Sequence, residues 1–586
     1  MGFLLIHPDD NQGSGPWRDL SWSGVIDLGL SGRSFYKQCS QNHGCPVVGL
    51  TSLHLGLADL RHVRDLLTAG RGRLLDNHGL DWWEILSIRL AEQLESVILL
   101  ERLVEEVAGD EVYISRPGFH ASVMQNLLKR RAHIFPLRRG DRGLGGLIHY
   151  IRAARKLSVS QIADVLCDKY DPGYRLRAHV SRRRRASGGP VVLIPTAYVN
   201  VSRTGIAYAE TLPQQDFLLV STRRSGWMKT LPSNVASAWL SSYAAARDRS
   251  AEAADMESRW RRLLTQLVEL KEFKILNDLG QFSQFPQQLR HGLEVRDAWR
   301  NVLDREPVQA VLCADDSNPF TRIPLLLARE RGLPNIACHH GALDGYYALK
   351  STYADVILAK GKMEQDYLVQ RCGVPADRVE IGAPAAPALT ALPNKQKKWT
   401  RIEFRPHILF VSECYEVGNA RAQEFYRDVL PPLADLALNT GRKLIVKLHP
   451  TESKSERVAM VKRVLSSQQM TVTQVVDGPL TDSLLDATWF AVSVLSTVAV
   501  ECALRNIPCF LCNWLEYSFY GYIDQFIRYG VGIRLNGPSE LLKLPEYLEK
   551  YEPDPAILAN CWEPIQAERL LSLFTSSPKV FARAAS

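Results

Sequence analysis

The sequence predicts an α/β protein with two domains, each built on a parallel sheet. Short apolar segments, typical of buried strands, alternate along the chain with segments of helical periodicity. The alternation stops at residues 384–400, a linker rich in Pro and Lys, and then starts again. A basic insert at residues 129–189 interrupts the first run. We therefore expect two β/α halves facing a cleft, with the insert in the first half.

The expected elements follow from two patterns. Apolar runs predict strands in the first half at residues 3–6, 25–28, 111–115, 191–195, 217–221, 308–313, 335–338 and 356–359, and in the second half at 407–411, 443–448, 471–476, 490–494 and 509–511. Apolar spacing of three and four residues predicts helices at 82–107, 236–270, 321–331, 422–440, 455–467, 480–487 and 498–505. The expected domain boundaries are 1–128 and 190–383 for the first half, 401–570 for the second half and 571–586 for a tail.

The composition is that of an ordinary folded protein. Of the 586 residues, 46% are hydrophobic and 23% are charged, which excludes a wholly disordered or collagen-like chain. The net charge of +8 is concentrated in one place. Residues 129–185 hold 16 Lys and Arg against 4 Asp, a local charge of +12, so the other 529 residues carry −4.

Neither an export signal nor a membrane span is predicted. The apolar run at residues 1–6 is too short for a secretory signal, and the longest apolar window ends at Glu501. The 11 cysteines are expected to stay reduced in the cytoplasm. Cys509 and Cys512 have no second pair nearby, so no structural metal is expected.

Polar residues after the first-half strands are candidates for a site, because ligands bind at the carboxyl ends of parallel strands. One strand leads to His339, His340 and Gly341, with Asp344 further along the turn. An imidazole at a strand end suits a general base, and His340 is the first candidate. The alternative is a His pair that only hydrogen-bonds the turn.

A carboxylate pair, Asp315 and Asp316, follows the strand at residues 308–313. The pair is interpreted as a base or as a ligand for a sugar, and the alternative is a structural turn. In the second half, the polar residues Ser412 and Glu413 likewise follow directly after the strand at 407–411.

The segment Lys447-Leu-His449-Pro450 ends another second-half strand. Strand alternation predicts that the Lys447 and His449 side chains lie on the same side, where two donors suit a phosphate. Pro450 fixes the turn.

A fourth strand leads to Ser496 and Thr497 at the expected start of a helix. Hydroxyls and free N–H groups there form an anion site, although a simple helix cap is an alternative that can hold at the same time. Glu501, one turn later, is interpreted as a ligand for a sugar hydroxyl or as part of a capping box.

Several nucleotide-binding motifs are absent from the sequence. It contains no Walker loop and no Gly-x-Gly-x-x-Gly between a strand and a helix, which weighs against a P-loop NTPase and a nicotinamide dehydrogenase. No Asp-x-Asp follows a strand, which favours chemistry without a metal.

The pattern Lys447-Leu-His449-Pro450 followed by Ser496-Thr497 resembles the HP and Ser-Ser/Ser-Thr motifs of bacterial GT-B glycosyltransferases. These are the sialyltransferase, polysialyltransferase and capsule or lipopolysaccharide Kdo-transferase types. The His340-Gly341 turn resembles that of CDP-glycerol glycerophosphotransferases. The resemblance covers roughly residues 308–533 and implies two Rossmann-like domains.

The resemblance also implies roles. His449, Ser496 and Thr497 would bind the donor phosphate with help from Lys447, and His340 or the Asp315/Asp316 pair would deprotonate the acceptor. The implied activity is metal-independent, inverting transfer from a nucleotide-activated sugar, a CMP-sugar being favoured, to a surface glycan or a lipid-linked acceptor. No cofactor besides this substrate is expected. The acidic-acidic-Gly motif of sialyltransferases is missing here.

Three alternatives remain open. The first is a CDP-alcohol phosphotransferase of the teichoic-acid type, and the second is a sugar-nucleotide epimerase. The third is a nucleic-acid-binding protein that uses the basic insert, although no nucleic acid is the favoured expectation. The insert is also interpreted as a docking surface for anionic lipid at the inner membrane face.

Overall fold

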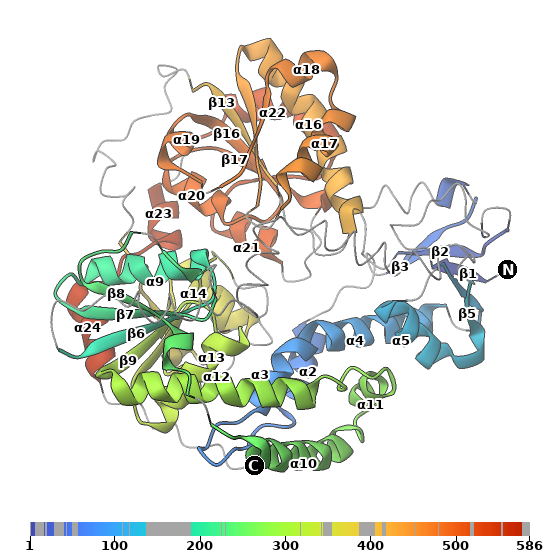
Figure 1. Ribbon diagram of the computed structural model, residues 1–586. Coiled ribbons are helices and arrows are strands. Elements are labelled where there is room, and N and C mark those ends of the chain that lie inside the picture. The colour runs from blue at the N-terminus through green and yellow to red at the C-terminus, as the bar shows by residue number, and fades with distance from the viewer. Residues whose placement is uncertain are drawn as a thin grey trace. The chain divides into compact units, whose positions relative to one another are not determined.

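The computed structural model describes residues 2–5, 17, 20–27, 40–42, 44–49, 57–107, 109–115, 118–135, 189–223, 226–228, 230–245, 247–316, 318–341, 343, 354–385, 405–412, 418–449, 452–478, 480–515, 521–552 and 555–576 (Figure 1). Some sequence predictions lie outside these residues. They concern Asp344, Glu413, Pro450, the basic insert from 136 to 188, most of the linker and the tail from 577.

The predicted α/β class is confirmed by three sheets in the described residues, each with only parallel strand pairs. The chain divides into two compact units, which we describe separately. One unit comprises Met1–Leu55, Val97–Ser158 and Ala388–Leu558; the other comprises Gly56–Ser96, Val159–Pro387 and Ala559–Ser586. The first holds a five-stranded and a six-stranded sheet, and the second holds a seven-stranded sheet.

The seven-stranded sheet has the order β12-β11-β10-β9-β6-β7-β8. Its strands are β6 (Val191–Thr196), β7 (Asp216–Ser221), β8 (Val235–Trp239), β9 (Val308–Cys313), β10 (Asn335–Cys338), β11 (Val356–Ala359) and β12 (Val379–Ile381). The helices of this unit are α2 (Leu57–Thr68), α3 (Trp83–Leu86), α9 (Val199–Thr211), α10 (Ser250–Leu267), α11 (Lys271–Asp278), α12 (Phe285–Arg305), α13 (Pro319–Glu330), α14 (Lys362–Asp366) and α24 (Ala567–Thr575). Every residue of β6 and of β8 is buried, and the burial of β6 on both faces explains its apolar run.

The six-stranded sheet has the order β15-β14-β13-β16-β17-β18. Its strands are β13 (His407–Val411), β14 (Lys443–Lys447), β15 (Thr473–Val476), β16 (Thr488–Ser493), β17 (Cys509–Cys512) and β18 (Ile533–Leu535). Its helices are α16 (Gly418–Thr440), α17 (Lys454–Val464), α18 (Ser467–Thr471), α19 (Asp482–Asp486), α20 (Val498–Leu504), α21 (Tyr522–Arg528), α22 (Leu544–Glu549) and α23 (Pro555–Cys561).

The five-stranded sheet has the order β3-β2-β1-β4-β5. Its strands are β1 (Phe3–Leu5), β2 (Gly24–Asp27), β3 (Val47–Gly49), β4 (Val112–Ile114) and β5 (Ala132–Ile134), and α4 (Ala91–Glu106) and α5 (Phe119–Leu128) are the neighbouring helices in sequence. A core of aromatic and apolar side chains that includes Trp17, Trp22 and Val25 packs in this part of the chain.

All three sheets share the Rossmann strand order. Numbered within each sheet, the strands run 3-2-1-4-5, extended to a sixth strand in one sheet and to a seventh in another. The order reverses between strands 1 and 4, which are β6 and β9 in the seven-stranded sheet and β13 and β16 in the six-stranded sheet. In open α/β sheets the connections leave in opposite directions at such a switch point, and ligands bind in the crevice outside the carboxyl ends of the strands.

Three of the differences between the structure and the sequence predictions concern how segments pair into sheets. Residues 1–128 and 190–383, expected to share one half, supply two separate sheets. The expected helix at 236–270 begins as β8, because Phe217–Ser221 of β7 pairs in register with Val235–Trp239. Ala132–Ile134 of the basic insert form β5, which pairs with β4. Pairing with a neighbouring strand outweighs local propensity in both segments.

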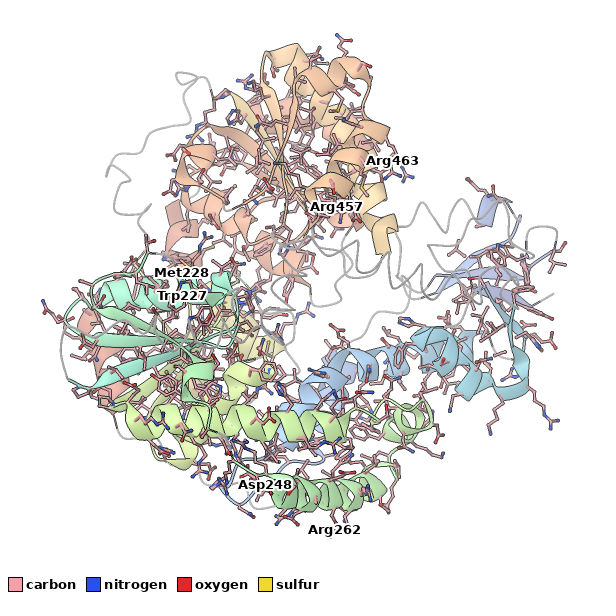
Figure 2. The ribbon with its side chains drawn as sticks, viewed as in Figure 1. Trp227, Met228, Asp248, Arg262, Arg457 and Arg463 are labelled. Carbon is pink, nitrogen blue, oxygen red and sulfur yellow. The ribbon has the colours of Figure 1, made fainter. Side chains whose placement is uncertain are left out.

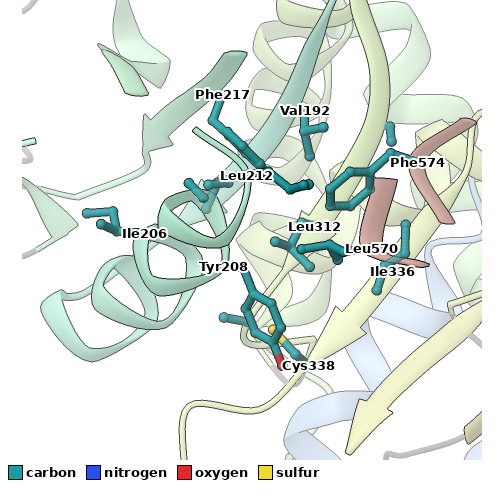
Figure 3. Close-up of a cluster of buried hydrophobic side chains, with 14 of the residues drawn as sticks. Val192, Ile206, Tyr208, Leu212, Phe217, Leu312, Ile336, Cys338, Leu570 and Phe574 are labelled. Atoms are coloured by element: carbon teal, nitrogen blue, oxygen red, sulfur yellow. The ribbon is translucent and has the colours of Figure 1, made fainter. Parts of the chain in front are cut away.

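The last described helix, α24, belongs to the core of the seven-stranded sheet. Leu570 and Phe574 of α24 are buried with Val192 of β6 and Leu312 of β9 (Figure 3). The Phe217 and Phe574 rings meet edge to face, with centroids 6.1 Å apart. The expected tail boundary at residue 571 therefore falls inside a core helix. None of the helices in the described part of the chain is long and apolar enough to cross a membrane.

Candidate functional site

The switch point of the seven-stranded sheet brings a tyrosine and a carboxylate together. Tyr198 follows β6 and Asp315 follows β9, and the Tyr198 hydroxyl donates a hydrogen bond to Asp315 Oδ2 at 3.1 Å. Asp315 is only 4% exposed. The sequence prediction selected Asp315 for its place after a strand, whereas Tyr198 was missed.

His340, at the end of the neighbouring strand β10, completes this group. The Tyr198 hydroxyl oxygen lies 3.4 Å from both ring nitrogens of His340, and the two rings are perpendicular with centroids 5.4 Å apart. His340 is half-buried, so the ring is supported on the protein side and keeps some exposed surface. The site thus has the order carboxylate, phenol, imidazole.

The phenol is held in its protonated form. Burial, and then the charge of the Asp315 carboxylate, raises the pKa of Tyr198 far above its ordinary value. The hydroxyl proton is directed to Asp315, so the phenol oxygen can only accept a hydrogen bond from His340. Tyr198 thus links the Asp315 carboxylate to the His340 ring.

His339 and Asp316, the chain neighbours of His340 and Asp315, make contacts that hold the backbone. His339 Nδ1 accepts a hydrogen bond from the Gly341 N–H at 3.1 Å, which is the turn-holding role considered as the alternative for the His pair. Asp316 is buried, and its carbonyl accepts from Arg322 Nε at 2.5 Å. The carboxylate that Tyr198 contacts is that of Asp315.

The helix after Asp315 and Asp316 explains why the carboxylates sit at the sheet edge. Asn318 caps α13, accepting a hydrogen bond from the Phe320 N–H at 2.9 Å, and Pro319 occupies the first turn. Thr321 Oγ1 donates to the Asp315 carbonyl at 2.5 Å. The chain is therefore fixed on both sides of the carboxylate pair.

In the six-stranded sheet, the residues that follow β13 and β14 are held together by Glu452, which sequence reasoning missed. Its carboxylate accepts hydrogen bonds from the His449 N–H at 2.8 Å and from Ser412 Oγ at 2.9 Å. Arg457 of α17 is labelled in Figure 2. Its Nε forms an ion pair with the same carboxylate at 2.7 Å. Tyr426 of α16 donates to Ser412 Oγ at 2.9 Å.

These contacts join two predicted site residues, Ser412 and His449, through one buried carboxylate. Only 1% of the Glu452 side chain is exposed. Burial, and then the Glu452 charge, raises the pKa of Tyr426 well above its ordinary value, so this phenol remains a donor. The His449 turn is thus held in one conformation by a charged network beneath it.

Lys447 lies in the same region with its side chain buried. Its ammonium donates to the Leu448 carbonyl at 2.5 Å, and burial lowers the pKa of Lys447. The Lys447 carbonyl also accepts from the Ser412 N–H at 2.9 Å, which ties β13 to the end of β14.

Ser496, Thr497 and Glu501 lie around the start of α20. Ser496 Oγ accepts a hydrogen bond from the Val498 N–H at 3.3 Å, and the Ser496 N–H donates to Ser493 Oγ at 3.4 Å. Thr497 and Glu501 are exposed, and Thr497 makes no side-chain cap. Ser496 therefore makes the local hydrogen bond that the capping interpretation predicted for one of the two hydroxyls.

Two of the missed residues carried a usable signal. Tyr198 follows the buried β6 by two residues, so the rule that selected Asp315 and His340 also applies to Tyr198. Lys360 directly follows β11, so the same rule applies to Lys360. Glu452 lies five residues beyond its strand, and only the folded turn brings its carboxylate back beneath His449.

Neither a family model nor a curated protein matches the sequence. Solved structures similar to this chain include the UDP-GlcNAc 2-epimerase from Methanocaldococcus jannaschii, with a TM-score of 0.40, 10% identity, and coverage of 66% of this chain and 99% of that one. MurG from Acinetobacter baumannii has a TM-score of 0.36, 13% identity, and coverage of 66% and 99%. A glycosyltransferase from Rickettsia africae has a TM-score of 0.35, 11% identity, and coverage of 67% and 95%. The fold class rests on the three parallel sheets themselves and not on these values.

Proposed function

We propose that the protein is a GT-B glycosyltransferase that moves a sugar from a nucleotide-activated donor to a glycan or lipid-linked acceptor, with inversion and without a metal. A CMP-sugar is the favoured donor. The observation that carries the proposal is the meeting of Asp315, Tyr198 and His340 at the switch point of a Rossmann-like sheet. Such a group suits the activation of a hydroxyl nucleophile.

In the proposed reaction, His340 accepts the proton of the acceptor hydroxyl as its oxygen attacks the anomeric carbon. The bond between that carbon and the donor phosphate oxygen breaks, and the electron pair leaves with the nucleotide. Tyr198 and Asp315 hold the imidazole and stabilise its charged form, because the carboxylate is fixed and buried. Attack opposite the leaving group inverts the anomeric centre.

The donor phosphate is proposed to bind the other Rossmann-like sheet. His449, Ser496 and Thr497 supply donors there, and Lys447 contributes positive charge. The buried Glu452 network supports this role, because a fixed turn loses little entropy when the phosphate binds. Charge that develops on the leaving phosphate is then met by groups already in place.

The first experiment incubates the protein with CMP-, CDP-, UDP- and GDP-sugars and measures nucleotide release with and without an acceptor mixture. Acceptor-dependent release from one donor is expected. Conversion of the sugar without an acceptor would indicate the epimerase, and transfer of an alcohol phosphate from a CDP-alcohol would indicate the phosphotransferase. Either result would replace the proposal.

His449→Ala tests the donor site without disturbing the fold. It is expected to abolish transfer and weaken nucleotide binding while the thermal unfolding midpoint changes little. His291→Ala is the matched control, since His291 is an exposed helix residue. Unchanged nucleotide affinity in His449→Ala would remove His449 from the donor site.

A further inference from the structure

Lys360, a buried lysine, donates hydrogen bonds to the turn that carries His340. The Lys360 ammonium donates hydrogen bonds to the His339 carbonyl at 2.5 Å and to the Gly341 carbonyl at 2.6 Å. These carbonyls belong to the residues on either side of His340. The Lys360 amine therefore fixes the backbone both before and after the proposed base.

The charge of Lys360 is compensated within the same strand-to-helix connection. Its ammonium lies 3.7 Å from Glu364 Oε2, and the two side chains are only 8% and 4% exposed. The same Glu364 oxygen accepts from the Lys360 backbone N–H at 2.7 Å. A buried ion pair gives little net stability after desolvation, so its contribution to stability does not explain why charged groups occupy these positions.

The turn itself is tightly packed. A Cβ atom on Gly341 would lie 2.9 Å from His339 Cε1, closer than real contacts allow. His339 Nδ1 already accepts from the Gly341 N–H. The backbone from His339 to Gly341 is thus held from two sides, by the His339 ring and by Lys360.

We propose that Lys360, with Glu364 as its counter-ion, is the positioning residue that aims the His340 imidazole at the acceptor hydroxyl. This inference rests on the proposed function for the role of His340 as base. Catalysis is sensitive to such positioning, because a displacement of about 1 Å costs on the order of 100-fold in rate.

Lys360 also places a positive charge beside the turn that carries His340. Among the described residues, the charged or titratable groups that contact His340 or its partners include Tyr198, Asp315, His339, Lys360 and Glu364. Lys360 is positively charged, and a nearby cation disfavours protonation of an imidazole. Its removal is therefore expected to move the acidic limb of the pH–rate profile to higher pH.

The test compares Lys360→Met with Lys360→Arg and with Lys362→Met. Lys362, two residues after Lys360 and the first residue of α14, pairs with Asp366, but its side chain is 50% exposed, which makes it a matched control. The readouts are kcat and KM with the donor found in the nucleotide-sugar panel, the pH–rate profile, and the histidine ring signals of protein labelled with 15N-histidine. His340→Gln assigns the His340 signal.

Lys360→Met is expected to lower kcat roughly 10- to 100-fold at unchanged donor KM, with the acidic limb and the His340 titration both shifted to higher pH. Lys360→Arg is expected to recover part of the rate, and Lys362→Met to behave as wild type. A merely structural role would lower the active fraction without moving either pH curve. Identical His340 signals in Lys360→Met and Lys362→Met would overturn the inference, whereas absence of turnover by the wild type would overturn the proposed function alone.

Discussion

Glu452→Gln tests whether the buried network shapes the donor site. The substitution keeps the size of the side chain but removes the charge that Arg457 faces at 2.7 Å. The amide has one acceptor oxygen in place of the two that serve the His449 N–H and Ser412 Oγ. Arg457, itself buried, would be left without its counter-ion.

The expected loss follows from that unpaired charge. Breaking a buried ion pair by removing one partner costs about 3–5 kcal/mol, and we expect a value near the lower end, ~3 kcal/mol, because the amide retains one hydrogen bond. Urea titration, monitored by hydrogen exchange of peptides from residues 443–464, measures the free energy of unfolding of this region apart from the rest of the chain.

Two variants control the interpretation. Asp477→Asn removes an exposed carboxylate that pairs with Lys454 at 2.9 Å, and no measurable change is expected. Glu452→Gln combined with Arg457→Met removes both charges and should recover most of the loss. If Glu452→Gln is no less stable than Asp477→Asn, or if the double variant recovers nothing, the reasoning about the network is refuted.

Tyr198→Phe is expected to keep the fold and lower kcat about 10-fold, since the ring remains but its hydroxyl no longer joins Asp315 to His340; an unchanged kcat would exclude the phenol from the site. Burial raises the pKa of Asp81 to about 6, so the folded state binds more protons than the unfolded state between about pH 4 and 6 and stability falls as the pH rises through that window. Asp81→Asn should remove this pH dependence, which amounts to roughly 3 kcal/mol of unfolding free energy for a pKa raised by about two units. Urea titrations of both proteins at several pH values measure it, and an equal fall of the unfolding free energy with pH in the two proteins would contradict the prediction. Deletion of residues 136–188, which carry 13 Lys and Arg against 4 Asp, should abolish sedimentation with anionic vesicles and preserve nucleotide binding, and vesicle binding that survives would remove the membrane role.

Most strands of the two larger sheets were predictable, because burial on both faces requires continuous apolar runs, but the three-residue strands β12 and β18 were not predicted. Val308–Cys313 and His407–Val411 were predicted with these bounds. The β8 strand was not, because its Ala and Ser residues leave the choice between helix and strand to the pairing with β7. The five-stranded sheet was missed as a unit because its strands are only three or four residues long.

The candidate site was predictable only where residues directly follow strands. Asp315 and His340 were found in this way, and the structure brings them together through Tyr198. The groups that hold the turns were not predictable, because their contacts depend on tertiary structure. Glu452 reaches Ser412 from 40 residues away, and Lys360 reaches His339 from the next strand. Sequence order does not show which carbonyl or carboxylate a buried charge will meet.

The stereochemistry of transfer tests the central proposal most directly. A 1H NMR time course with the active nucleotide-sugar and its acceptor follows the anomeric proton of the donor and that of the product. Direct displacement by an acceptor activated by His340 predicts a product of inverted configuration, formed together with free nucleotide, and no product with His340→Gln. Retention of configuration, or a nucleotide-sugar epimerised without acceptor, would contradict it.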